Sequence, residues 1–148
     1  MQITVDSRGG FLQEVTARGK HLLVDEPVEV GGTNQGLNPY ELLLGALGTC
    51  TAMTLMMYAR RKGLPLESVR VELDHERVHA RDCEDCEEKD AFLDRFRKRI
   101  AVRGPLSDEQ IASLLEISRK CPVHRTLTGE IRIEDALFLE DQPADRGA

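Results

Sequence analysis

In residues 38–63 the chain reads NPYELLLGALGTCTAMTLMMYARRKG. Asn38 can cap a helix, Pro39 suits its first position, and Glu41 falls three residues after the cap, so a helix is predicted to begin at residue 39. The cations at residues 60–62 suit the negative end of a helix dipole, and Gly63 can terminate the helix. We therefore expect a helix over residues 39–62, roughly 36 Å long at about 1.5 Å per residue.

This helix is apolar on all sides, because no charged residue occurs from Leu42 to Tyr58. Such a helix is either buried all round or spans a membrane, and the stretch is just long enough for a bilayer. Its glycines and threonines and its setting among short strands favour burial. One chain of 148 residues has little core with which to surround it, so we expect a homodimer in which each subunit covers the other's helix. Gly45 and Gly48 would allow close approach.

Composition indicates a single soluble domain over residues 1–148. Hydrophobic residues make up 41% and charged residues 31%, which is typical of a globular protein. The net charge of −6 and the absence of tryptophan argue against a nucleic-acid partner. No basic and then apolar leader is visible at the start, which predicts a cytoplasmic protein without a membrane partner.

The rest of the chain alternates strands and helices, which predicts an α+β fold. Pro122 should stop the second helix, and Ser107 with Gln110 forms a capping-box pattern at its start. The expected elements are a β-meander over residues 1–30, strands over 69–81 and 91–103 around an acidic loop at 82–90, the second helix over 107–121, a last strand over 127–138 and a loose tail over 140–148.

Two of the four cysteines lie on the predicted helices. In a cytosolic chain, cysteines favour chemistry or metal binding over structural disulfides. Cys50 lies in the middle of the first helix, where it can equally be a small buried apolar residue. Cys121 is placed at the C-terminal end of the second helix, where the dipole disfavours a thiolate. If the two meet, Cys50 is expected to be the nucleophile and Cys121 its resolving partner, with an arginine nearby to offset burial.

The other two cysteines belong to the pattern His75-x3-His79-x3-Cys83-x2-Cys86. Four nitrogen and sulfur ligands suit tetrahedral zinc, and a Cys-x2-Cys pair can also be redox-active. The histidines lie along a predicted strand, however, and the acidic neighbours of the cysteines would raise thiol pKa values. An exposed acidic loop without essential chemistry is therefore favoured, and the zinc and redox interpretations stay open.

The two cysteine segments resemble known motifs. Residues 38–54, followed by 58–63, are similar to the first-cysteine helix of the OsmC/Ohr family, which holds osmotically inducible protein C and the organic hydroperoxide resistance proteins. Residues 121–127, CPVHRTL, resemble the second-cysteine motif of the same family, and the OsmC-like branch is the closest. The resemblance implies an intertwined homodimer with antiparallel sheets wrapped around two long buried helices.

The same resemblance implies a cysteine-based peroxidase that reduces organic hydroperoxides in oxidative-stress defence. Cys50 would become a sulfenic acid, Cys121 would condense with it to a disulfide, and an external dithiol would restore the pair. No metal or organic cofactor is needed. The alternative is a non-enzymatic dimer of the same fold that binds a small apolar ligand or a metal.

One position departs from the pattern of the studied peroxidases. They carry a glutamate ten residues before the first cysteine, paired with an arginine from the N-terminal region, and Tyr40 stands there in this chain. Glu41, one residue later, is the candidate replacement or simply the capping carboxylate. Arg18 is the first candidate for the arginine and Arg8 the second, although each can be a solvated turn residue.

Overall fold

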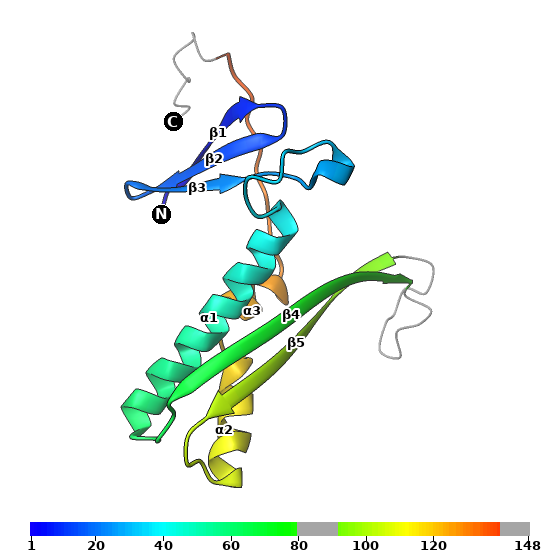
Figure 1. Ribbon diagram of the computed structural model, residues 1–148. Coiled ribbons are helices and arrows are strands. Elements are labelled where there is room, and N and C mark those ends of the chain that lie inside the picture. The colour runs from blue at the N-terminus through cyan, green and yellow to red at the C-terminus, as the bar shows by residue number, and fades with distance from the viewer. Residues whose placement is uncertain (80–91, 140–148) are drawn as a thin grey trace.

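The computed structural model describes residues 1–79 and 92–139, which form a mixed α+β fold (Figure 1). Its elements in chain order are β1 (Thr4–Gly9), β2 (Leu12–Ala17), β3 (Lys20–Val24), the 3-10 turn η1 (Val28–Val30), α1 (Pro39–Lys62), β4 (Ser68–His79), β5 (Phe92–Arg103), α2 (Asp108–Ser118) and α3 (Pro122–Leu127). The predicted acidic loop at 82–90, with Cys83 and Cys86, and the predicted tail at 140–148 lie outside the described residues.

The first three strands form an antiparallel meander in the order β1-β2-β3 at the N-terminal end of α1 (Figure 1). Tight turns join the strands, and Arg18 and Gly19 both have positive φ in the second turn. The meander ends at Val24, earlier than the predicted residue 30, because a loop containing η1 follows.

Asp25 organises this loop. Its carboxylate is 2% exposed and accepts hydrogen bonds from the backbone N–H groups of Glu26, Thr33 and Gln35 and from the Thr33 hydroxyl at 2.6 Å. A buried carboxylate needs several donors, and the loop supplies them. The loop is thereby folded back on β3, and the chain is directed into α1.

α1 occupies the range that the sequence signals predict. The Asn38 side chain accepts from the Glu41 N–H at 2.9 Å, and a Glu41 carboxylate oxygen accepts from the Asn38 N–H at 2.8 Å, which is a complete capping box. At the other end Gly63 has φ of 64°, a left-handed conformation that glycine adopts without steric cost.

A long antiparallel hairpin, β4 and β5, lies across α1 (Figure 1). Its register runs from Ser68 opposite Arg103 to His79 opposite Phe92. Gly48 lets the helix approach this hairpin closely, because a Cβ at that position would lie 2.8 Å from Leu73 Cδ1. α2 and α3 pack against α1 as well.

Only one face of α1 is covered within a single chain. Four of its five buried residues follow one line along the helix, Leu47, Thr51, Leu55 and Ala59, and the fifth, Gly48, lies beside that line. On another face Met53 is 65% and Met57 72% exposed, so burial on all sides is not achieved by one subunit. Within the described residues α1 is the one helix that is long and apolar enough to cross a membrane, a test that core helices of soluble proteins also pass.

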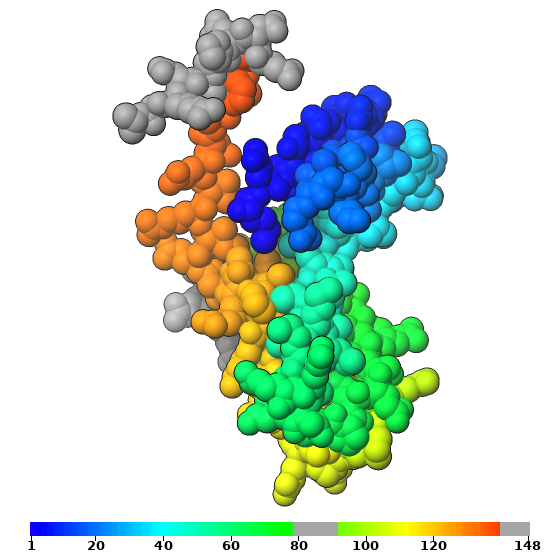
Figure 2. Space-filling model, turned by 90° about the vertical axis from the view of Figure 1, so that its left-hand side faces the viewer, coloured from blue at the N-terminus to red at the C-terminus, as the bar shows by residue number. Residues whose placement is uncertain are grey.

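The C-terminal third differs from the prediction at two points. The second helix ends at Ser118 rather than residue 121, and a separate short helix, α3, begins after Cys121. The strand predicted over residues 127–138 is wrong for the described chain: residues 128–139 form no strand and extend from α3 toward the end that carries the N-terminal sheet (Figures 1 and 2). Alternating residues such as Ile131 and Ile133 stay exposed, because none of the strands in the described part of the chain pairs with them.

Candidate functional site

Cys50 of α1 and Cys121 of the α2–α3 junction come together on the packed side of α1. A hydrogen bond between the two thiols shifts the pKa of each, and the charge of Cys121 also acts on the pKa of Cys50. Cys121 is completely buried, whereas Cys50 is partly exposed, and both are free thiols. Two cysteines far apart in the sequence therefore form one site, called here the cysteine pair.

Pro122 explains the position of Cys121. A residue that precedes proline is disfavoured in the helical region, and Cys121 accordingly has φ of −60° and ψ of 134°. The chain leaves α2, takes this extended residue and enters α3, so Cys121 is an N-cap rather than a helix C-terminus. Its sulfur accepts a hydrogen bond from the His124 N–H at 3.3 Å. The sequence-based placement of Cys121 at a helix end that disfavours a thiolate is therefore wrong.

Lys98 of β5 brings a positive charge to the cysteine pair. Its ammonium donates to the Thr51 hydroxyl at 3.2 Å and to the Ser118 carbonyl at 3.0 Å. The Thr51 hydroxyl is itself 3.7 Å from the Cys121 sulfur. Lys98 is thus anchored to α1 and to the end of α2, next to the buried thiol.

The two thiols have opposite pKa shifts. Burial is the largest effect on Cys50 and raises its pKa. The Val123 N–H acts next and lowers that pKa, Cys121 raises it, and the Thr54 hydroxyl lowers it least. Burial also acts to raise the pKa of Cys121. However, hydrogen bonds from the His124 N–H, Cys50 and Thr51, together with the charge of Lys98, outweigh it and lower that pKa.

The other titratable groups at the site respond to the same surroundings. Burial lowers the pKa of Lys98, and the charge of Arg119 lowers it further, while both cysteines act to raise it. Burial also lowers the pKa of His124, with Lys98 and Arg119 adding to the effect. A histidine with a pKa below its usual value is neutral at pH 7, so Lys98 rather than His124 supplies positive charge to the Cys121 thiol at this pH.

Two hollows flank the cysteine pair. One, of about 410 Å³, begins at Thr54, one helical turn after Cys50, and is lined by Thr54, Met57, Tyr58, Arg61, Ile117, Lys120 and Pro122. The other hollow, of about 320 Å³, has Lys98 and His124 in its lining. Neither cysteine lines these two hollows or a third one of about 430 Å³ between α1 and β4. The 410 Å³ hollow lies near the cysteine pair, because its lining includes Thr54, one turn from Cys50, and Pro122, which follows Cys121.

The structure brings together two of the four predicted site residues. Glu41 is exposed and engaged in the capping box of α1. Arg18 is exposed in the β2–β3 turn, and Arg8 pairs with Glu14 on the N-terminal sheet. One chain does not carry either arginine to the cysteine pair, so a role for Arg18 or Glu41 in the chemistry stays a prediction.

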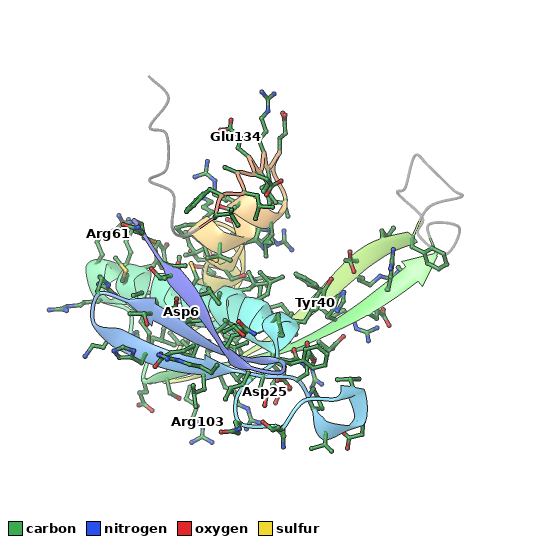
Figure 3. The ribbon with its side chains drawn as sticks, turned by 90° about the horizontal axis from the view of Figure 1, so that it is seen from above. Asp6, Asp25, Tyr40, Arg61, Arg103 and Glu134 are labelled. Atoms are coloured by element: carbon green, nitrogen blue, oxygen red, sulfur yellow. The ribbon has the colours of Figure 1, made fainter. Side chains whose placement is uncertain are left out.

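His75, the first residue of the candidate zinc pattern, has other partners. Its Nε2 lies 2.8 Å from Asp94 Oδ1. Its ring stacks on that of Tyr40, which is labelled in Figure 3, with centroids 4.7 Å apart. Within residues 1–79 and 92–139 no group of three histidine, cysteine or acidic side chains converges on a common point. Cys83 and Cys86 are not among those residues.

Sequence reasoning missed Lys98 and Thr51. Lys98 lies on the face of β5 that also carries Phe96, Ile100 and Val102, all partly buried. A lysine at an inward position of an alternating strand was the available signal, because a charge there requires partners. Thr51 carried no comparable signal, since threonine in an apolar helix commonly bonds to its own backbone, as it does here to the Leu47 carbonyl.

Comparison with known proteins agrees with this architecture. Residues 32–134, most of the chain, match the family model of the OsmC-like proteins. The chain belongs to the OsmC-like protein family. Among curated relatives, YmaD of Bacillus subtilis (strain 168) is 44% identical over 46 residues, which is 31% of this chain and 31% of YmaD. The aligned part thus spans about a third of that relative.

Solved structures of the OsmC-like family share the fold at low sequence identity. An OsmC-like protein from Mycoplasma pneumoniae has a TM-score of 0.67 at 20% identity, covering 86% of each chain. The organic hydroperoxide resistance protein OsmC from Legionella pneumophila has a TM-score of 0.62 at 19% identity, covering 87% of this chain and 90% of that one. OhrB of Bacillus subtilis, an organic hydroperoxide resistance protein, has a TM-score of 0.59 at 17% identity, covering 87% of this chain and 92% of OhrB.

Proposed function

We propose that this OsmC-like protein is a cytoplasmic, homodimeric, thiol-dependent peroxidase that reduces organic hydroperoxides in oxidative-stress defence. The observation that carries the proposal is the meeting of Cys50 and Cys121 beside Lys98, near a hollow lined by Thr54 and Pro122. The names of the organic hydroperoxide resistance proteins that share the fold support the substrate class.

The proposed reaction uses both sulfurs in turn. The deprotonated Cys50 sulfur attacks the outer oxygen of the hydroperoxide, the O–O bond breaks, and the alcohol leaves with a proton. The Cys121 thiolate then attacks the Cys50 sulfenic acid, forming the disulfide and releasing hydroxide that is protonated to water. An external dithiol reduces the disulfide by exchange and is itself oxidised to a disulfide.

The lining of the hollow next to Cys50 favours apolar hydroperoxides. Apolar surface in this hollow comes from Met57, Ile117 and Pro122. The hydrocarbon substituent of a hydroperoxide would bury that surface. Hydrogen peroxide has no such substituent and would gain nothing from these contacts. We therefore expect cumene hydroperoxide to react faster than hydrogen peroxide.

The exposed apolar face of α1 supports the homodimer. A second copy that covers Met53 and Met57 would remove from water surface that one chain leaves open. Size-exclusion chromatography with light scattering tests this: a dimer is expected, and a monomer would contradict it. Partition of the full chain into membranes would instead favour the use of α1 as a membrane helix.

The activity is tested by following hydroperoxide consumption with dithiothreitol as the reductant. Wild-type protein is expected to turn over, Cys50→Ser to be inactive, and Cys121→Ser to be oxidised at Cys50 without forming the disulfide. The Cys83→Ser/Cys86→Ser variant is the matched control that keeps the cysteine pair. Unchanged consumption in Cys50→Ser, or none in wild type, would overturn the proposal. Bound zinc in wild-type protein that is inactive would favour the ligand-binding alternative.

A further inference from the structure

The hollow of about 320 Å³ between α1, β5 and α3 carries charged side chains of opposite sign. Asp94, Phe96 and Lys98 occupy alternate positions of β5, so their side chains lie on one face of the strand. The Cα atoms of Asp94 and Lys98 lie about 13 Å apart, at roughly 3.3 Å per residue of strand. We call this site the charged hollow, and the lining that matters here is Leu47, Asp94, Phe96, Lys98, His124 and Leu127.

The Asp94 carboxylate is held in place and keeps one oxygen available. Its Oδ1 lies 2.8 Å from His75 Nε2, and the His75 ring is itself fixed by stacking on Tyr40. Within residues 1–79 and 92–139 the other oxygen, Oδ2, has no hydrogen-bond or ion-pair partner. The Asp94 side chain is 53% exposed, so this end opens to solvent, and Phe96 lines the hollow two residues further on. A carboxylate beside an aromatic ring suits an ammonium group.

The opposite end offers donors to an anion. The Lys98 ammonium has three N–H groups, and it uses two of them on the Thr51 hydroxyl and the Ser118 carbonyl. The His124 ring also lines the hollow, and in the described part of the chain its nitrogens have no hydrogen-bond partner. Because burial lowers the pKa of His124, the ring is neutral at pH 7 and can donate one N–H. A free ammonium donor and a ring N–H together suit a carboxylate.

Apolar side chains lie among these polar groups in the lining. Leu47 of α1 is only 4% exposed, and Leu127 of α3 adds further apolar surface. A ligand that reaches both ends would bury a hydrocarbon body against these side chains. The volume of about 320 Å³ is at the lower end of ligand pockets, so the ligand must be small.

We propose that the charged hollow binds a small zwitterion whose ammonium and carboxylate are separated by a short chain, with the ammonium at Asp94 and the carboxylate at Lys98 and His124. An ordinary α-amino acid does not match this spacing, because both of its charged groups are attached to one carbon. An ω-amino acid or a short peptide with free ends does match it. The cysteines take no part in this binding, so the inference does not rest on the proposed peroxidase function.

Isothermal titration calorimetry at pH 7 tests the ligand class with four matched probes. The probe 6-aminohexanoate carries both charges at the ends of a chain. Hexanoate and hexylamine each lack one charge, and norleucine is the isomer with both charges at one end. We expect 6-aminohexanoate to bind one per chain and roughly tenfold more tightly than the other three, since a hydrogen bond to a charged group accounts for about that factor. Equal binding of norleucine would overturn the proposal.

A fifth probe distinguishes the two sources of such a ligand. Trialanine has a free ammonium and a free carboxylate with peptide groups between them. Tighter binding of trialanine than of 6-aminohexanoate would assign the charged hollow to short peptides, and the reverse order would assign it to free ω-amino acids. Both orders support the site, whereas the failure of both probes to bind would overturn it.

Substitutions at the two ends should act on different probes. Asp94→Asn is expected to weaken 6-aminohexanoate roughly tenfold and to leave hexanoate unchanged. Lys98→Met should weaken 6-aminohexanoate by a similar factor and leave hexylamine unchanged. Asp74→Asn and Arg99→Met remove charges from the outer face of the same hairpin and are the matched controls. Unchanged binding in Asp94→Asn, or the same loss in the controls, would refute the assignment.

A reversal of charge gives a test that misfolding cannot imitate. Asp94→Lys should bind adipate, which has a carboxylate at each end, more tightly than 6-aminohexanoate, and wild type should show the opposite preference. If Lys98→Met fails to fold, this variant decides, because position 94 is half exposed. An unchanged preference in Asp94→Lys would contradict the proposal.

The Cys50→Ser variant separates this inference from the proposed function. It is expected to bind 6-aminohexanoate as wild type does, because Cys50 does not line the charged hollow. Binding by a wild-type protein that consumes no hydroperoxide would sink the proposed function alone. Hydroperoxide turnover by a protein that binds none of the zwitterions would sink the charged hollow alone.

Discussion

Tyr40 of α1 stacks face to face on His75 of β4, with ring centroids 4.7 Å apart and planes 7° apart. Tyr40 stands where the related peroxidases are expected to carry a glutamate, and the structure gives it a packing role between helix and hairpin. Phe96 completes the cluster. Its ring makes an edge contact with that of His75, with ring centroids 5.0 Å apart. The position that departs from the resemblance is therefore occupied by a residue that joins α1 to the β4–β5 hairpin.

The stacking predicts a measurable contribution to stability. Tyr40→Ala should lower the free energy of unfolding by about 1 kcal/mol, because an aromatic pair contributes roughly 0.5–1.5 kcal/mol beyond its buried area. Tyr40→Phe keeps the ring and should have the wild-type value. Urea denaturation followed by circular dichroism measures both, and equal stabilities for Ala and Phe would contradict the packing role.

Glu41 can be tested as a cap and as a site residue in one variant. Glu41→Gln keeps an oxygen that accepts from the Asn38 N–H but removes the carboxylate charge. If Glu41 serves the capping box alone, stability and hydroperoxide turnover should both be unchanged. Asn38→Ala is the comparison and should destabilise by about 1 kcal/mol, since it removes the cap acceptor. A large loss of turnover in Glu41→Gln at unchanged stability would place the carboxylate in the chemistry.

A substitution of Arg18 can distinguish a role in the β2–β3 turn from a role in catalysis. It has φ of 51°, a conformation that asparagine adopts more readily than arginine. Arg18→Asn should therefore keep or slightly raise stability. Turnover should be retained if Lys98 is the cation of the cysteine pair. Loss of turnover in this variant, with stability unchanged, would show that Arg18 acts at the site.

The Asp25 carboxylate is expected to contribute to the stability of the fold, and this contribution should be lost in acid. The Thr33 hydroxyl, with the backbone donors of the loop, lowers the pKa of this carboxyl against the effect of burial. The unfolded chain therefore binds the proton more tightly, so the contribution is present above the unfolded pKa and is lost as pH falls through the folded one. Asp25→Asn should lower the melting temperature at pH 7 and show a smaller loss of stability on acidification than wild type. Parallel curves for the two proteins would refute this.

The sequence predicted the elements whose signals are local. The bounds of α1 follow from Asn38, Pro39 and Gly63, and the hairpin follows from alternation in β4 and β5. The last strand was not found in the structure, because residues 128–139 have the alternation of a strand but pair with no strand among residues 1–79 and 92–139. Alternation describes the faces of a segment, whereas strand formation also needs a partner.

The cysteine pair was predictable only in part. Two cysteines in matched motifs indicated that Cys50 and Cys121 would meet, but their charge state depends on groups brought in by the tertiary fold. Lys98 approaches from β5, and Pro122 makes Cys121 an N-cap instead of a helix end. These effects depend on tertiary contacts, so helix position alone gave the wrong electrostatic environment for Cys121.

The most direct test of the account is peptide mapping of the reduced Cys83→Ser/Cys86→Ser protein after one equivalent of cumene hydroperoxide. We expect that the chain loses two hydrogens and that a disulfide joins the peptides carrying Cys50 and Cys121. The matched Cys50→Ser protein should give no such product. Folded, reduced protein that leaves the hydroperoxide intact, or that oxidises without joining these two cysteines, would contradict it.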